Sequence, residues 1–150
     1  MSNVSNEKFI IHTDGGSRGN PGPGAIGAVI KSANGTLKKE YGEFIGNDVT
    51  NNEAEYKAVI FALKKLKQLI GKEKAAHSYV DIFVDSELLE RQMNKKFKVS
   101  DREIGQFFLQ VWNLTMDFGE VTFNHVFREK NKEADRLVNA VLDKEVNKLL

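Results

Sequence analysis

The hydrophobic pattern of this chain changes its period near residue 50, and that change limits the folds open to it. Before this point, residues 9–13, 25–30 and 36–44 are rich in β-branched and aromatic side chains, which is typical of strands. After it, apolar residues recur with helical spacing over residues 52–70. Asn34-Gly35 is a hairpin-turn dipeptide, so the second and third strands are predicted to pair in antiparallel fashion.

The second half of the chain alternates between the same two patterns. The short apolar run at residues 79–84 is typical of a buried strand. Further elements are expected at residues 86–94 (helix), 101–118 (helix), 121–127 (strand) and 131–149 (helix). The order βββαβααβα predicts an α/β fold, with a five-stranded mixed sheet flanked by helices. We expect one domain over residues 1–150, with residues 1–7 as a flexible N-terminal tail.

Composition excludes several classes of protein. Hydrophobic residues make up 41% and charged residues 29% of the chain, which is ordinary for a globular domain. The lack of cysteine excludes a disulfide scaffold, a zinc–thiolate site and a cysteine nucleophile. The net charge of +1 argues against nucleic-acid binding through bulk charge. No apolar run reaches the ~20 residues of a membrane helix. The polar residues 1–6 are unlike a signal peptide, so we expect a soluble, cytoplasmic protein.

One acidic residue of the first helix is placed unusually. At about 100° per residue, Glu55 falls in the middle of the apolar stripe, whereas Glu53 falls on the far side with several lysines. A carboxylate in a core-facing stripe is costly unless it is paired or bound to a metal. The alternative is that Glu55, in the first turn, only complements the helix dipole.

Three more acids fit the same pattern. Asp135 lies within the apolar stripe of the last helix, and Asp143 lies near its border. Asp14 and Asp85 each end a predicted strand, and ligand sites of open α/β sheets lie beyond the carboxyl ends of strands. Asp81 lies roughly 13 Å back along its strand, so we interpret it as an edge or loop-facing residue outside the cluster.

Four converging carboxylates would repel one another unless a cation lies between them. Oxygen-rich sites without cysteine suit hard divalent cations such as Mg²⁺. Two such ions about 4 Å apart can activate a water molecule and stabilise the leaving oxygen of a phosphodiester. The spacing therefore predicts metal-assisted phosphoryl transfer or hydrolysis.

Four segments of the chain carry a family resemblance. They are residues 13–24 (TDGGSRGNPGPG), 50–56 (TNNEAEY), 84–86 (VDS) and 131–135 (NKEAD). In this order they closely resemble type 1 ribonuclease H over nearly the whole chain, which implies the ribonuclease H-like fold. The resemblance matches the four metal-binding catalytic acids of that family to Asp14, Glu55, Asp85 and Asp135.

The resemblance also implies a substrate and its contacts. The family cleaves the RNA strand of RNA–DNA hybrids with Mg²⁺ or Mn²⁺ and leaves 5′-phosphate and 3′-hydroxyl ends. Positions that read the RNA 2′-hydroxyl match Gly15, Gly16, Asn20, Asn51 and Asn52, while Thr50 and Ser86 match DNA-contacting positions. Without the resemblance, Asn51 and Asn52 would be interpreted as helix caps and the glycines as a loop. No membrane or obligate protein partner is implied, and we expect a monomer.

The chain departs from the family at two places. His125 has the spacing of a loop histidine found in bacterial members, but it lies in a predicted strand, so Arg128, Glu129 or Lys130 is expected to occupy the vacated region. A basic, tryptophan-rich protrusion is missing, and only a link with Lys95, Lys96 and Lys98 connects the two helices. This link is either a solvated connection or a reduced phosphate-binding handle. Trp112, in the following helix, is expected to be a core residue.

Two other functions remain as alternatives. The first is another nuclease on the same fold, such as a junction resolvase, but the Gly-Asn-Pro-Gly and Thr-Asn-Asn motifs favour hybrid recognition. The second is a hybrid-binding module without catalysis. Binding alone would not need four acids that repel phosphate, so the presence of all four argues against it.

Overall fold

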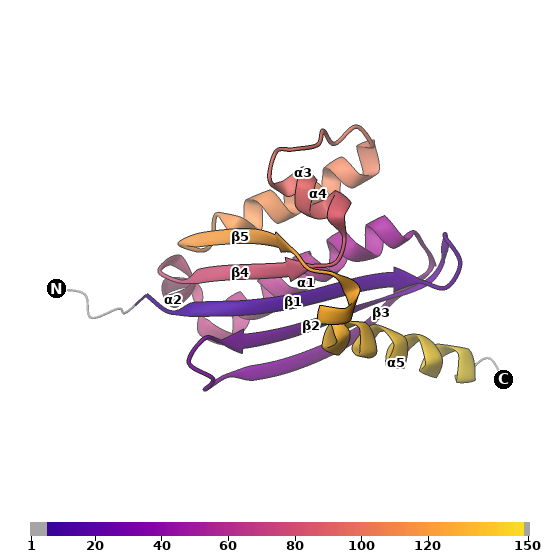
Figure 1. Ribbon diagram of the computed structural model, residues 1–150, viewed down its shortest axis with the longest axis horizontal. Coiled ribbons are helices and arrows are strands. Elements are labelled where there is room, and N and C mark those ends of the chain that lie inside the picture. The colour runs from indigo at the N-terminus through magenta and orange to yellow at the C-terminus, as the bar shows by residue number, and fades with distance from the viewer. Residues whose placement is uncertain (1–5, 149–150) are drawn as a thin grey trace.

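The computed structural model describes residues 6–148 of the chain (Figure 1). The strands are β1 (Lys8–Ser17), β2 (Gly22–Ser32), β3 (Lys38–Val49), β4 (Tyr79–Val84) and β5 (Glu120–His125). The helices are α1 (Asn51–Ile70), α2 (Lys72–Ala76), α3 (Glu87–Met93), α4 (Arg102–Thr115) and α5 (Lys132–Lys148), with a 3₁₀ turn, η1 (Arg128–Lys130), before α5.

The five strands form one mixed sheet in the order β3-β2-β1-β4-β5. β1, β2 and β3 pair in antiparallel fashion, and the predicted turn at Asn34-Gly35 connects β2 to β3. β4 pairs parallel with both β1 and β5. The predicted α/β fold with a five-stranded mixed sheet is therefore confirmed.

Helices cover the two faces of the sheet unequally. In Figure 1, α1 lies behind the sheet, and α5 lies in front of it, where it contacts β1, β2 and β3. The main core forms on the α1 side, where Phe9, Ile11 and Ile82 pack with Val59 and Leu63 of α1. A smaller cluster on the α5 side consists of Ala25, Val138 and Leu142, with Val141 packed against it.

Two glycines let helices approach the sheet closely. A Cβ atom added to Gly15 would lie 2.2 Å from the Ala54 carbonyl oxygen, so the first turns of α1 rest directly on β1. A Cβ atom added to Gly27 would lie 2.4 Å from the Ala134 carbonyl oxygen, so the start of α5 rests on β2 in the same way. Because these helix ends carry Glu55 and Asp135, the two glycines set how near those acids come to the sheet.

The observed elements differ from the predicted ones mainly at their ends. β1 continues to Ser17 through its glycines because the ladder with β2 persists as far as the Ser17–Gly24 pair. Asp14 therefore lies inside β1 and not at its end. The short α2 and η1 were not predicted, and β3 extends to Val49. His125 is the last residue of β5, as expected for a strand histidine.

Several burial predictions were wrong or need qualification. Trp112 is 49% exposed, because the buried side of α4 passes through its neighbour Val111. Leu69 in α1 and Val146 in α5 are apolar residues of the predicted helices but are also exposed. Asp81 does not lie at an edge, since β4 has β1 on one side and β5 on the other. It binds Lys8 at 2.9 Å and accepts a hydrogen bond from Thr122 at 2.8 Å, outside the acid cluster.

The two chain ends lie partly outside the described residues. Residues 1–5 of the predicted tail are outside them, and so is Leu149, the last residue of the predicted final helix. Glu7 accepts a backbone hydrogen bond from Tyr79 at 2.8 Å and forms an ion pair with Lys74 at 2.9 Å. Within residues 6–148, no helix is both long and apolar enough to cross a membrane.

We predict that Gly27→Ala lowers the free energy of unfolding by about 1–3 kcal/mol, because the added methyl group overpacks the contact with α5. Urea denaturation measures this change. The matched control is Gly105→Ala in α4, where an added Cβ would meet no atom within 4 Å. This control should stabilise the protein by about 0.4–1 kcal/mol. Equal effects of the two variants would contradict the close approach at Gly27.

Candidate active site

The pairing of β1 with β4 places two carboxylates side by side. The last parallel pair joins Thr13 to Val84, so Asp14 and Asp85 follow it on adjacent strands. β1 continues past this point, whereas β4 ends at Val84. Asp85 therefore lies in the turn that leads from β4 into α3. Asp14 is only 6% exposed, and its Oδ1 atom accepts a hydrogen bond from the Gly15 N–H at 3.0 Å.

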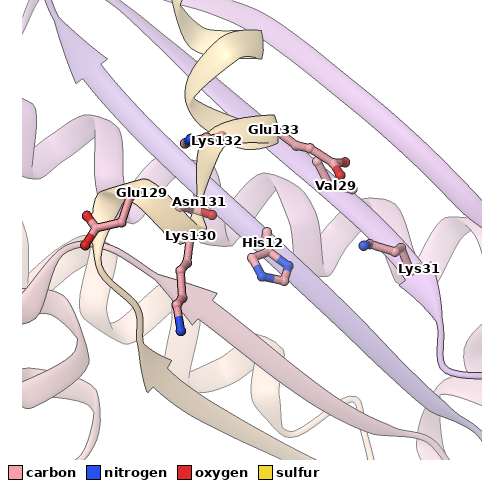
Figure 2. A pocket seen from close by; sticks show the side chains of 8 residues that line it. All are labelled: His12, Val29, Lys31, Glu129, Lys130, Asn131, Lys132 and Glu133. Atoms are coloured by element: carbon pink, nitrogen blue, oxygen red, sulfur yellow. The ribbon is translucent and has the colours of Figure 1, made fainter.

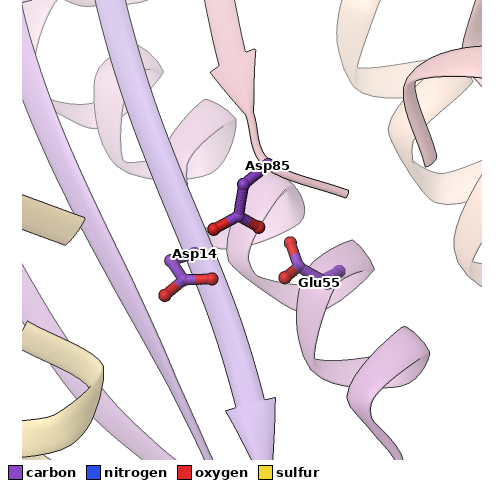
Figure 3. A group of neighbouring side chains, drawn as sticks. All are labelled: Asp14, Glu55 and Asp85. Carbon is purple, nitrogen blue, oxygen red and sulfur yellow. The ribbon is translucent and has the colours of Figure 1, made fainter. Parts of the chain in front are cut away.

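The third carboxylate comes from the start of α1. Thr50 caps this helix, since its hydroxyl oxygen accepts a hydrogen bond from the Glu53 N–H at 3.1 Å. Glu55 then points from the first turns toward the end of β4 and is 9% exposed. Figure 3 shows Asp14, Glu55 and Asp85 converging, and one carboxylate oxygen of each lies within 4.8 Å of the others.

Glu53 is separated from this group although it is only two residues from Glu55. Its carboxylate pairs with Lys57 on the next turn of α1, at 2.6 Å. The helical phase that selected Glu55 as the core-facing acid is thus confirmed. Glu53 does not lie on a solvated far side, however, because its side chain is only 13% exposed and lines a separate hollow.

Asp135, the fourth predicted acid, lies on the α5 side of the same cleft. It is not part of the group of three, but its charge acts on Asp14. The start of α5 is held near β1 by Asn131, whose side-chain amide donates a hydrogen bond to the Thr13 carbonyl oxygen at 2.8 Å. Asn131 is 1% exposed, and sequence reasoning assigned it no structural role. Its place at the start of the predicted last helix could have indicated this structural role.

Burial and mutual repulsion change the acidity of two of these groups. Burial, and then the nearby charge of Asp85, raise the pKa of Asp14 to about 7. Burial, and then the charges of Asp14 and Asp85, raise the pKa of Glu55 well above its ordinary value. Both carboxylates therefore hold protons more tightly in the folded chain than in the unfolded chain.

The carboxylates line an open cleft of about 670 Å³. Most of the residues predicted to contact nucleic acid line it as well, namely Gly15, Gly16, Asn51, Asn52, Ser86 and Arg128. Asn20 and Thr50 instead line a neighbouring hollow of about 330 Å³, which also reaches Asn52. Lys95, Lys96 and Lys98 lie in the link between α3 and α4 and are not among the residues that line the cleft.

Several of these polar residues also hold the local backbone together. The Asn51 side-chain oxygen accepts a hydrogen bond from the Ser17 N–H at 2.9 Å, and the Asn51 N–H donates to the Asn20 side chain at 3.0 Å. These bonds tie the turn after β1 to the start of α1. Ser86 caps α3 by accepting a hydrogen bond from the Leu89 N–H at 3.1 Å. The caps are thus Thr50 and Ser86. The capping interpretation of Asn51 and Asn52 was wrong, because both lie within the first turn of α1 and Thr50 precedes them. Ser86 also lines the cleft, and Thr50 lines the neighbouring hollow.

A second cavity of about 230 Å³ lies beside the start of α5 and contains none of the four acids (Figure 2). His12 lines it and stacks on Phe83, with ring centroids 5.0 Å apart. Burial and the charge of Lys31 lower the pKa of His12. The cavity is lined by two acids, Glu129 and Glu133, and by three lysines, Lys31, Lys130 and Lys132, so charges of both signs surround it.

The donor set of the cleft fits a hard divalent cation. Glu55 Oε2 and Asp85 Oδ2 are buried and have no hydrogen-bond partner. A buried carboxylate oxygen without a partner is costly, and a coordinated cation would remove that cost. The converging ligands are all carboxylate oxygens, which suits Mg²⁺ or Mn²⁺ rather than a metal that prefers nitrogen or sulfur.

Comparisons with known proteins identify relatives in sequence and in fold. A family model described as "Reverse transcriptase-like" matches residues 12–141. The chain is 35% identical over 130 residues to ribonuclease HI of Halobacterium salinarum, covering 87% of this chain and 62% of that protein. It is 40% identical to LC11-RNase H1, solved in complex with an RNA/DNA hybrid, with a TM-score of 0.85 and coverage of 92% of this chain and 99% of that one.

The chain belongs to the type 1 ribonuclease H family. Its resemblance to that family in sequence is thus confirmed. A further solved relative is the N-terminal RNase H domain of Rv2228c from Mycobacterium tuberculosis, with 32% identity and a TM-score of 0.85, covering 97% of this chain and 100% of that one. The whole of that mycobacterial protein, named "Bifunctional protein Rv2228c", is longer, and the match covers 36% of its length.

We predict that Asp14→Asn raises the melting temperature of the metal-free protein at pH 8 by about 2–6 °C, which corresponds to about 1–2 kcal/mol. The variant removes a buried charge that Asp85 and Asp135 repel. Calorimetry with a chelator measures the shift, and Asp48→Asn, at an exposed acid of β3, is the matched control.

The same repulsion should make the stability of the metal-free protein depend on pH. Because the folded pKa values of Asp14 and Glu55 are raised, their contribution to stability is present at low pH and is lost as pH rises. For Asp14 this loss is complete once the pH has passed its folded pKa of about 7. The difference in melting temperature between wild type and Asp14→Asn should therefore shrink between pH 8 and pH 5. A constant difference would contradict the raised pKa of Asp14.

Proposed function

We propose that this chain is an endoribonuclease that hydrolyses the RNA strand of RNA–DNA hybrids and leaves 5′-phosphate and 3′-hydroxyl ends. The observation that carries the proposal is the convergence of Asp14, Glu55 and Asp85, with unpartnered buried oxygens, in a cleft that Asp135 also lines. The likeness to LC11-RNase H1, a protein solved with an RNA/DNA hybrid, supports this choice of substrate.

The four acids would hold two Mg²⁺ ions when the hybrid is bound, and Mn²⁺ can substitute. Such ions supply an activated water molecule and stabilise the leaving oxygen of the phosphodiester. The chain's own part is to hold the carboxylates at the end of the β1–β4 pair and to keep two of their oxygens free of other partners. We propose that the chain does this as a monomer, because a single copy supplies all four acids.

Substrate choice in this proposal depends on the RNA 2′-hydroxyl. Gly15, Gly16, Asn51 and Asn52 line the cleft beside the carboxylates, where backbone groups and short side chains can approach a wide, shallow minor groove. Asn20 and Thr50, in the adjoining hollow, are placed to extend the contact along the duplex. Several such contacts must form together, so a run of ribonucleotides should be cut better than a single one.

The decisive experiment compares labelled duplexes of one sequence with and without Mg²⁺. We expect cuts in the RNA strand of the RNA–DNA hybrid, with 5′-phosphate ends, and no cuts in duplex DNA. Addition of a chelator should abolish cleavage. Cleavage of DNA junctions instead of the hybrid would favour a resolvase-like nuclease, and tight hybrid binding without any cleavage would favour a binding module. Efficient cutting at a lone ribonucleotide would contradict recognition by several contacts.

The neighbouring acids of α1 provide a matched pair of variants. Glu55→Gln should lower the cleavage rate by orders of magnitude, because it removes a ligand oxygen from the carboxylate group. Glu53→Gln should change the rate little, since Glu53 pairs with Lys57 away from that group. Single-turnover rates at saturating hybrid measure both effects. The opposite ranking would refute the assignment of Glu55.

A further inference from the structure

A basic side chain that sequence analysis left unassigned lies in the cleft. Among the described residues that line it, the basic ones are Arg18 and Arg128. The carboxylates of Asp14, Glu55 and Asp85 line the same cleft and would repel the phosphates of any nucleic acid. A basic side chain within the cleft would offset that repulsion. The lysines of the α3–α4 link do not line the cleft, so they are not placed to do so there.

The backbone of Arg18 is fixed relative to the carboxylates. Its N–H donates a hydrogen bond to the Pro23 carbonyl oxygen at 2.9 Å, which closes the turn between β1 and β2. The preceding residue, Ser17, donates its N–H to the Asn51 side chain at the start of α1. The backbone at Arg18 is therefore held close to the helix that carries Glu55. Its long side chain can still rotate to reach different partners.

The partner of Arg18 in the present structure is a carboxylate on α5. A terminal guanidinium nitrogen lies 2.5 Å from Asp143 Oδ1, and the two side chains are 39% and 65% exposed. Exposed ion pairs contribute little to stability, so this one can be exchanged at low cost. A guanidinium group binds phosphate with the same planar, two-pronged geometry that it uses for a carboxylate.

We propose that Arg18 is a phosphate-binding residue of the hybrid, and that Asp143 holds its guanidinium group until a backbone phosphate takes the carboxylate's place. The inference rests on the proposed function and adds a substrate contact to it. Asp143 then works against binding in two ways, since it competes with the phosphate for Arg18 and also repels it. The pair sets how strongly the α5 side of the cleft attracts nucleic acid.

The test measures hybrid affinity in a chelator across a series of salt concentrations. Arg18→Ala should weaken binding about tenfold and reduce the slope of log affinity against log salt by about one. Arg18→Lys keeps the charge, so it should retain the slope while losing part of the affinity. Asp143→Asn should strengthen binding about threefold in the wild-type background, and by clearly less when Arg18 is already alanine.

A second ion pair of α5 serves as the matched control. Arg136 lies 3.3 Å from Glu40, and neither residue lines the cleft. Arg136→Ala and Glu40→Gln should change hybrid affinity less than twofold. Melting temperatures of all variants are measured alongside, so that a loss of affinity caused by unfolding is recognised.

The outcomes separate the inference from the proposed function. If wild type cuts the hybrid but Arg18→Ala binds it with unchanged affinity and salt slope, the phosphate contact is refuted and the nuclease stands. An equal effect of Asp143→Asn with and without Arg18 would refute the competition between carboxylate and phosphate. If wild type neither binds nor cuts the hybrid, the proposed function itself fails.

Discussion

The parallel pairing of β1 with β4 is the constraint on which the rest of the site depends. The pairing ends at Thr13 and Val84, and the residue that follows each of them is an aspartate. The two aspartate side chains therefore lie next to each other. β1 continues along β2 beyond this point, which gives the cluster a floor of sheet on one side. Glu55 and Asp135 are then brought in by helices that start close to this position.

This arrangement has an energetic cost that the fold must carry. Asp14 and Glu55 are both buried, and burial and the charge of Asp85 raise the pKa of each. The main hydrophobic core beneath them is continuous from β1 through α1 to α4. Burial of these side chains stabilises the fold and offsets the repulsion within the acid cluster. A buried hydrogen bond of 2.7 Å from the Tyr56 hydroxyl to Gln92 adds a fixed link between α1 and α3, next to the cluster. Buried carboxylates that repel one another lower the stability of the fold, and such groups are typical of functional sites.

The elements and the acids differ in how far the sequence could predict them. Periodicity places Glu55 in the core-facing stripe and Glu53 outside it, because a long helix has a well-defined phase. The full length of β1 could not be predicted, because its glycines lack the side chains on which strand patterns depend. Trp112 was misplaced because hydrophobicity alone does not say which of two adjacent apolar residues faces inward. The pairing of Arg18 with Asp143 joins residues more than a hundred positions apart, and no local pattern reports such a contact.

The unequal burial of the two helices that carry acids has a consequence for motion. α1 buries a continuous stripe from Ala54 to Leu66, whereas the buried residues of α5 within the described chain are Ala134, Val138 and Leu142. Segments with few buried contacts open locally at a lower free energy than the core. Of these two helices, α5 is therefore expected to detach first, and its detachment would carry Asp135 and Asp143 away together. Asp14, Glu55 and Asp85 would stay assembled on the sheet and α1, so we expect the amides of α5 to exchange faster than those of α1.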